Sequence, residues 1–212
     1  MLIDAWRYIL AHPDRFGDAL WRHVTLSAAA LAIAATIAIP LGIWLAGQAR
    51  LALVVINATN LGRTLPSLAV LALTMPFLGT GFVPSLFALT LLALPPILIN
   101  TYTAIRQVDP DVIDAARGMG MTQREITRRV VVPLAVPVIA TGVRIASIQV
   151  ISGAVLAAYI GGGGLGDFIT AGIAMMQLPL LLVGAVPATL LAIGADFLMG
   201  RVQRSLRPRG IA

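Results

Sequence analysis

The chain alternates long apolar runs with short charged segments. The first run, residues 24–49, contains no charged side chain over 26 positions between His23 and Arg50. Because a helix needs about 20 apolar residues to cross the hydrocarbon core of a bilayer, this run predicts a transmembrane helix over 24–46. Further apolar stretches predict three more spans, at 85–105, at 136–159 between Pro133 and Gly161, and at 178–199.

A fifth predicted span is less regular. The uncharged stretch 64–105 covers 42 residues, and it contains a cluster of helix breakers: Pro76, Gly79, Gly81 and Pro84. The part before this cluster is too short to cross a bilayer alone. We therefore expect a continuous helix that begins in the apolar stretch 51–62, carries Arg63 within it and runs to about residue 76.

Polar and proline residues inside these spans are candidates for a solute path. They are Asn57, Asn60 and Arg63 in the second span, and Pro95 and Pro96 in the third. Ionisable groups within a membrane usually face the protein interior or a water-filled path. Alternatively, Arg63 snorkels to the inner interface. The two prolines remove helix hydrogen bonds and predict a kink.

Composition places the chain in the membrane. Apolar residues make up 58% of the sequence and charged residues only 11%, too few charges for a soluble domain of this size. The absence of cysteine excludes a disulfide scaffold. We expect one all-α, polytopic domain over 1–212, with five transmembrane helices. Residues 1–23 predict an interfacial helix that ends near Pro13, because Leu2, Trp6 and Ile9 have helical spacing.

The arginines predict the orientation of the chain. All 15 basic residues are arginine, so the chain has no lysine for an ATP-binding P-loop. If the segment after the third span is cytoplasmic, ten arginines lie inside and three outside, and two lie in or beside spans. Positively charged loops stay in the cytoplasm, which predicts an external N terminus and a cytoplasmic C terminus in the cell inner membrane.

One long cytoplasmic loop, residues 106–133, carries the densest local signals. Asp109 as N-cap and Pro110 at the first position predict a helix over about 110–118, which the glycines after it end. Thr122 and Glu125 form a capping box that opens a second helix, expected to end near Pro133. Three interpretations remain: a DNA-binding helix-turn-helix, disfavoured because so short a loop should lack a core of its own, a basic loop on anionic lipid, or a docking helix for a partner.

The loop also resembles a family motif. Asp114, Ala115 and Ala116 are followed after three residues by Gly120, and nine residues later by Val130-x-Val132-Pro133. This spacing is similar to the EAA loop, E-A-A-x3-G-x9-I-x-L-P, of permease subunits of binding-protein-dependent ABC importers. Four further segments extend the resemblance to the osmoprotectant group: Thr64–Leu68, Asn100–Thr103, Arg117–Met121 and Ile160–Phe168. Methionine importers share the loop motif and the glycine-rich segment, and are the nearest competitor.

The resemblance implies a function and a set of partners. The loop would couple to two cytoplasmic ATPase subunits through Asp114, Ala115, Ala116, Gly118, Gly120 and Pro133. ATP and Mg²⁺ would be bound by those subunits, with no cofactor on this chain. A solute-binding protein would dock outside, and two permease chains, identical or different, would enclose the path. The solute would be glycine betaine, choline or carnitine. Two other classes remain open: a transporter or channel that works without ATP, and a membrane anchor.

Other features predict no chemistry. The sequence suggests no catalytic residue, no metal site and no nucleic-acid partner. Gly161, Gly163 and Gly166 match a dinucleotide-binding pattern, but they follow a predicted membrane span and not a strand, so we do not expect a nucleotide site there. We expect this glycine segment to form a tight external re-entry that approaches the backbone of a partner. Arg144 is expected to snorkel, and Asp196 to pair with a cytoplasmic arginine.

Overall fold

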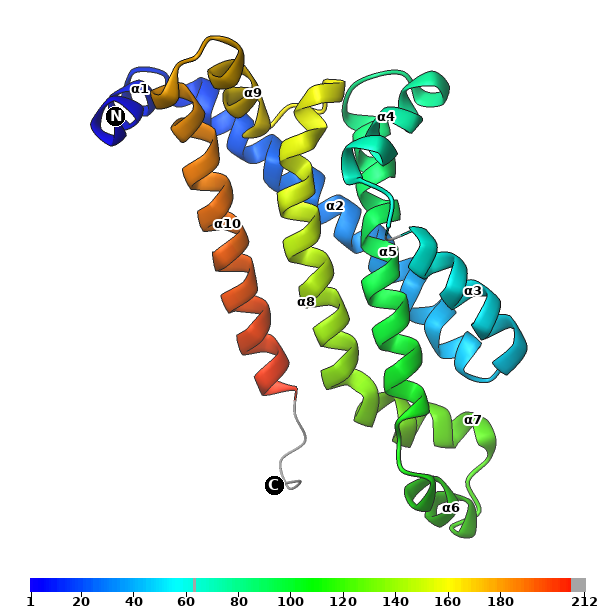
Figure 1. Ribbon diagram of the computed structural model, residues 1–212. Coiled ribbons are helices and arrows are strands. Elements are labelled where there is room, and N and C mark those ends of the chain that lie inside the picture. Colours follow the sequence, from blue (N-terminus) through cyan, green and yellow to red (C-terminus); the bar gives the residue numbers. More distant parts are fainter. Residues whose placement is uncertain (63, 207–212) are drawn as a thin grey trace.

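The structure is a computed structural model that describes residues 1–62 and 64–206, and these residues form helices and turns without any strand (Figure 1). The all-α prediction is confirmed. The α-helices in chain order are α1 Leu2–Ala11, α2 Pro13–Ala46, α3 Ala49–Gly62, α4 Ser67–Leu78, α5 Phe82–Arg106, α6 Pro110–Gly118, α7 Gln123–Ile126, α8 Val132–Leu156, α9 Gly166–Ala174 and α10 Leu178–Ser205.

Four of the described helices are long and apolar enough to cross a membrane. They are α2, α5, the continuous helix Gln123–Ile160 that contains α8, and α10. These helices extend beyond their predicted spans, because a run without charges measures the apolar thickness of a membrane and not the end of a helix. Thus α2 begins at Pro13, eleven residues before the predicted start at 24, and α10 continues to Ser205.

The predicted second span is not one continuous helix. It is divided into α3 and α4, whose axes differ by 98°. Pro66 precedes the start of α4 and disfavours a helical conformation for Leu65, so the chain turns at this point. The continuous helix over 51–76 is therefore wrong. Arg63, which we expected inside this span, lies outside the described residues.

Small residues let the central helices approach one another. α5 packs against α2 and α8, and its buried face meets alanines on both neighbours. A Cβ at Gly42 of α2 would lie 2.8 Å from the Thr101 side chain of α5, and one at Gly142 of α8 would lie 2.8 Å from the Pro96 carbonyl. Close backbone packing of this kind holds helices together in lipid, where burial of apolar surface gives little drive.

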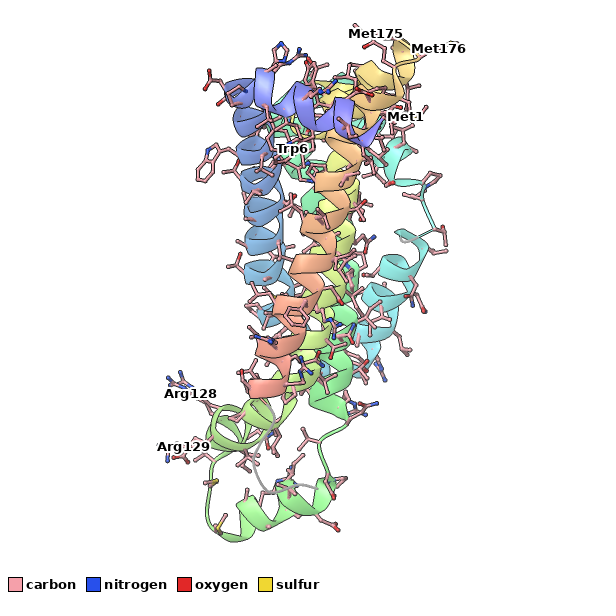
Figure 2. All side chains as sticks on the ribbon, turned by 90° about the vertical axis from the view of Figure 1, so that its left-hand side faces the viewer. Met1, Trp6, Arg128, Arg129, Met175 and Met176 are labelled. Atoms are coloured by element: carbon pink, nitrogen blue, oxygen red, sulfur yellow. The ribbon has the colours of Figure 1, made fainter. Side chains whose placement is uncertain are left out.

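The two ends of the bundle differ in character. Arg128 and Arg129 project from the end that carries α6 and α7, whereas Met1, Trp6 and Met176 lie at the opposite end (Figure 2).

The predicted N-terminal helix is present as α1. Its Ala5 is buried in a cluster with Phe168, Leu180 and Val183, while an apolar face remains exposed. That exposed face is formed by Leu2, Ile3, Trp6 and Leu10.

Candidate functional site

The loop between α5 and α8 begins with the short helix α6. The Asp109 carboxylate accepts a hydrogen bond from the backbone N–H of Asp111 at 2.9 Å, and Pro110 occupies the first turn. Asp114 and Arg117 form an exposed ion pair of 2.9 Å on the helix surface. The predicted helix over 110–118 is therefore confirmed in its boundaries and its cap.

A glycine turn ends α6. Gly120 has φ +81°, a left-handed conformation that glycine adopts without steric cost. The N–H of Met121 donates to the Ala116 carbonyl at 3.2 Å and that of Met119 to the Ala115 carbonyl at 3.1 Å, so the last carbonyls of the helix are satisfied. The turn depends on the backbone freedom of Gly120 and not on space, because a Cβ there would meet no atom within 4 Å.

The second half of the loop differs from the prediction. The capping box is present: the N–H of Thr122 donates to the Glu125 carboxylate at 3.0 Å, and the N–H of Glu125 donates to the Thr122 hydroxyl at 3.4 Å. The helix does not end near Pro133, however. It continues through a π-helical turn, Thr127–Val131, into α8. This wider turn comes immediately before Pro133, whose ring would otherwise crowd the carbonyl one turn back.

The loop has a small core of its own, so the expectation that so short a loop lacks a core is wrong. Ala116, Ile126 and Val131 are buried together, and Ile105, Val108, Ile113, Met121 and Val130 pack around them. α6 is therefore held against the start of the long helix. The predicted small-residue face is divided: Ala116 points inward, whereas Ala115 is exposed beside Asp114 and Gly118.

The exposed face of α6 also carries apolar side chains that the sequence analysis missed. Met119 is 73% exposed and Val112 is 40% exposed. Exposed apolar residues on a rigid charged loop are typical of an interaction surface. We call the exposed set Val112, Asp114, Ala115, Gly118, Met119 and Gly120 the docking face. The signal in the sequence was Met119 itself, an apolar residue between two turn glycines.

The candidate path residues do not form one group. Pro95 is buried and lines a cavity of about 640 Å³ between α3, α4 and α5, with Thr59, Ser67 and Gln149 as polar lining residues. Pro96 is buried against α8 instead, and α5 continues unbroken through both prolines. Asn57 and Asn60 are exposed on α3, outside this cavity lining.

The glycine-rich segment at the other end packs against its own chain. Arg22 Nε donates to the Gly162 carbonyl at 2.9 Å, and a Cβ at Gly163 would lie 2.7 Å from that same Nε. Gly162 to Gly166 are buried, so the expectation that this segment approaches a partner's backbone is wrong for these positions. The short helix α9, which was not predicted, follows directly. Partial desolvation raises the pKa of its Asp167, against the attraction of Arg22 and Arg15.

Two intramembrane charges are paired. Arg144 of α8 and Asp196 of α10 form two hydrogen bonds, of 2.6 and 2.8 Å. Arg144 therefore does not snorkel, and the partner of Asp196 is a residue inside a span and not a cytoplasmic arginine. A pairing between positions so distant in sequence had no signal in the chain pattern.

The fold and this loop together define a class of protein: a helical membrane subunit whose loop between two spans has a core of its own, of the kind found in type I ABC importers. The family model described as "Binding-protein-dependent transport system inner membrane component" matches residues 38–209. The chain belongs to this family of inner-membrane permeases, and it is a multi-pass transport subunit.

Individual relatives and structures agree with this assignment. The chain is 43% identical over 191 residues to the choline transport system permease protein OpuBB of Bacillus subtilis, covering 90% of this chain and 88% of that one. It is 41% identical to the carnitine transport permease protein OpuCB of Listeria monocytogenes, with the same coverage. A solved structure of the MetNI methionine ABC transporter matches the fold with a TM-score of 0.81 at 22% identity, covering 92% of this chain and 97% of that one.

Proposed function

We propose that this chain is the permease of an ATP-driven importer that carries quaternary ammonium osmoprotectants such as glycine betaine, choline or carnitine. The observation that supports this is the identity of about 40%, over 90% of the chain, with permeases named for carnitine and choline transport. The likeness to a methionine transporter, at 22% identity, concerns the fold alone.

In this proposal the docking face contacts a separate ATPase subunit. The loop core holds α6 against the end of the helix Gln123–Ile160. A displacement of α6 by a bound partner would therefore be transmitted to a membrane-spanning helix. Asp114, Ala115, Gly118 and Gly120 form the contact surface, Ala116 holds α6 from inside, and Pro133 follows the π-helical turn that joins loop and span. ATP and Mg²⁺ belong to the ATPase, since this chain lacks a P-loop lysine.

Two permease chains would enclose the path, as a homodimer or with a related chain. In this proposal the surface around α3, α4 and α5, which exposes apolar side chains beside the cavity that Pro95 lines, meets the second chain. These side chains are Leu61, Leu65, Leu68, Leu73, Phe77, Phe87 and Leu91. We place Asn57 and Asn60 toward the path in the assembled importer, where polar side chains would face water.

In the proposed orientation, α6 lies in the cytoplasm and α1 and α9 lie outside. Since the chain has no cysteine, single cysteines can report this directly. With Thr122→Cys, an impermeant thiol reagent should label protein in inverted vesicles only. With Met176→Cys, at a position 95% exposed, it should label whole cells. The reverse pattern would contradict both the orientation and the docking of α6 on an ATPase.

The decisive experiment is uptake by proteoliposomes that contain the permease, its ATPase and its binding protein. We expect uptake of a radiolabelled betaine, choline or carnitine that requires ATP. Uptake of methionine alone would overturn the osmoprotectant assignment and retain the importer. Uptake without ATPase or ATP would overturn the importer itself.

A further inference from the structure

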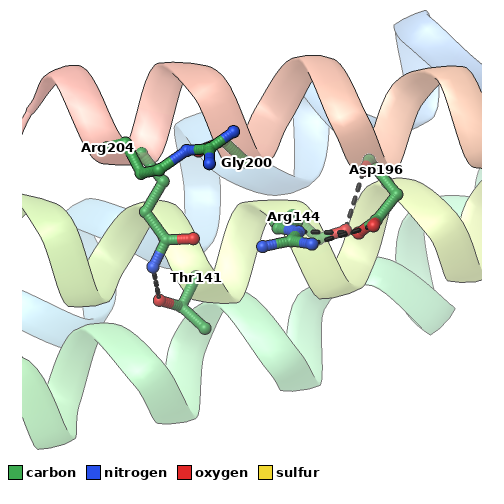
Figure 3. Close-up of polar contacts among 7 residues, drawn as sticks. Thr141, Arg144, Asp196, Gly200 and Arg204 are labelled. Atoms are coloured by element: carbon green, nitrogen blue, oxygen red, sulfur yellow. Dashed lines mark hydrogen bonds and ion pairs between the residues drawn. The ribbon is translucent and has the colours of Figure 1, made fainter.

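Polar side chains join α8 and α10 within the membrane-spanning region. Arg144 donates two parallel hydrogen bonds to Asp196, from Nε at 2.6 Å and from Nη2 at 2.8 Å (Figure 3). Further along the same pair of helices, Gln203 Nε2 donates to the Thr141 hydroxyl at 2.6 Å. Bidentate arginine–carboxylate contacts fix geometry as well as energy. We call Arg144, Asp196, Thr141 and Gln203 the α8–α10 clasp.

Few side chains of the inner half of α10 are buried, and between Thr189 and Ser205 only Gly200 is. A cavity of about 430 Å³ lies between α2, α8 and α10 on the outer side of the clasp, and one of about 400 Å³ lies beside the ion pair. Only 22% of the apolar window of α10 is buried, against 56% for α5. Gly200 leaves room for the clasp, because a Cβ there would lie 3.2 Å from Arg144 Nη1. The inner half of α10 is therefore held by polar contacts more than by interdigitated side chains.

The outer half of α10 is packed differently. It lies tightly against α9, where a Cβ at Gly172 would lie 2.7 Å from the Leu181 Cα and one at Gly184 would lie 2.8 Å from the Ile169 side chain. α1 also packs on α10 at this end. α10 thus connects the clasp to the helices of the outer face, while α8 connects the clasp to the docking loop.

We infer that Arg144 and Asp196 are positioning residues for transport: they tie α10 to the helix that carries the docking loop, so that movement of the loop reaches α9 and α1 on the outer face. This inference rests on the proposed importer function. The clasp is a distinct element, because none of its residues belongs to the docking face or lines the cavity between α3, α4 and α5.

The test is to replace the ion pair without leaving an unpaired charge. Arg144→Met combined with Asp196→Leu substitutes apolar side chains, so that no charge is left without its partner, which is the change that most destabilises such a pair. We expect thermal stability and ATPase recovery near the wild type, but uptake per folded molecule about tenfold lower, within the usual range of coupling between sites. The exchange Arg144→Asp with Asp196→Arg should recover part of the uptake that either single variant loses.

A matched control is Arg201→Met on the same helix. Arg201 lies over the Phe197 ring at 4.5 Å, outside the clasp, and its loss should leave uptake unchanged. If the apolar pair transports like the wild type per folded molecule, or if uptake falls only in proportion to folded protein, the pair is structural and the inference is wrong.

A second measurement does not depend on transport. Spin labels at Val138→Cys on α8 and Val202→Cys on α10, both partly exposed, report the separation of the two helices. We expect a broader distance distribution with the apolar pair than with the native pair, and an unchanged distribution would overturn the inference. Failure of the wild type to take up solute would instead count against the importer function, and the spin-label result would still decide whether the clasp holds α10.

Discussion

Two glycine-rich segments lie at opposite ends of the molecule, which we call inner and outer after the proposed orientation, and the two segments differ in what they require of glycine. In the docking loop, added Cβ atoms at Gly118 and Gly120 would meet no atom within 4 Å, and only the φ of +81° at Gly120 requires glycine. In the outer segment, Cβ atoms at Gly162 and Gly166 would collide with the chain itself. The inner turn needs conformational freedom alone, whereas the outer segment needs space as well, because Gly161, Gly163 and Gly164 also have positive φ values and Gly162 and Gly166 have no room for a Cβ.

This difference tells where a partner can contact the protein. The outer glycines are buried by α2, α5 and α8, so their shape serves the fold of this chain. The surroundings of the inner glycines are open, so any atom that meets them belongs to another molecule. Substitutions at the outer segment should therefore act on folding, whereas bulky or charged substitutions at the docking face should act on transport.

The largest expected effect is at Gly166. In Gly166→Ala, the new Cβ would collide with the Val155 carbonyl and lie 2.8 Å from the Ala158 Cβ. Because the backbone cannot move aside as a side chain can, we expect the free energy of unfolding to fall by about 1–3 kcal/mol. Little folded protein should then be recovered. Size-exclusion profiles and thermal melting in detergent measure this.

The control for that substitution is Gly194→Ala in α10, where a Cβ would meet nothing within 4 Å. Its melting temperature should match that of the wild type. If the two alanine variants had the same melting temperature, the claim that the outer segment has no room for a Cβ would be wrong.

The next effect is at Gly120. Gly120→Asp places a charged side chain on the docking face at a local cost of about 1 kcal/mol for the left-handed backbone. We expect folded protein near the wild-type amount and uptake reduced by about tenfold or more, with poor recovery of the ATPase. The variant Gly120→Asn carries a side chain of the same shape as aspartate but without the charge, so it separates the effect of charge from the effect of side-chain size. Full uptake and full ATPase recovery with Gly120→Asp would contradict the docking assignment.

Local sequence signals predicted the inner end of the molecule well. The cap at Asp109, the helix over 110–118, the glycine turn and the capping box at Thr122 all follow from neighbours within four residues. The continuation of the helix past Pro133 did not, because the π-helical turn that accommodates the proline has no simple pattern. The core of the loop was also missed, since Ile126 and Val131 reach Ala116 only after the chain folds back.

The transmembrane region was predicted as a set of spans but not as a packed structure. Runs without charge indicated the spans because lipid excludes charge, yet they could not give the ends of helices that continue into water. Pro66 indicates a break between α3 and α4, but the length of the apolar stretch around it favoured the prediction of one continuous helix. The pairing of Arg144 with Asp196 depends on how α8 and α10 pack, which no local pattern contains.

The smallest expected effect is at Gly118 and sharpens the comparison most. Gly118 ends α6 with an ordinary helical backbone, and a methyl group there would point into open space. Alanine is also the better helix former, so Gly118→Ala should change stability by no more than about 0.5 kcal/mol. We expect uptake and ATPase recovery equal to those of the wild type, measured beside Gly120→Asp at matched expression. Loss of uptake without loss of folded protein would mean that a bound partner fills this space, so that the inner turn too would need glycine for room and not for conformation alone.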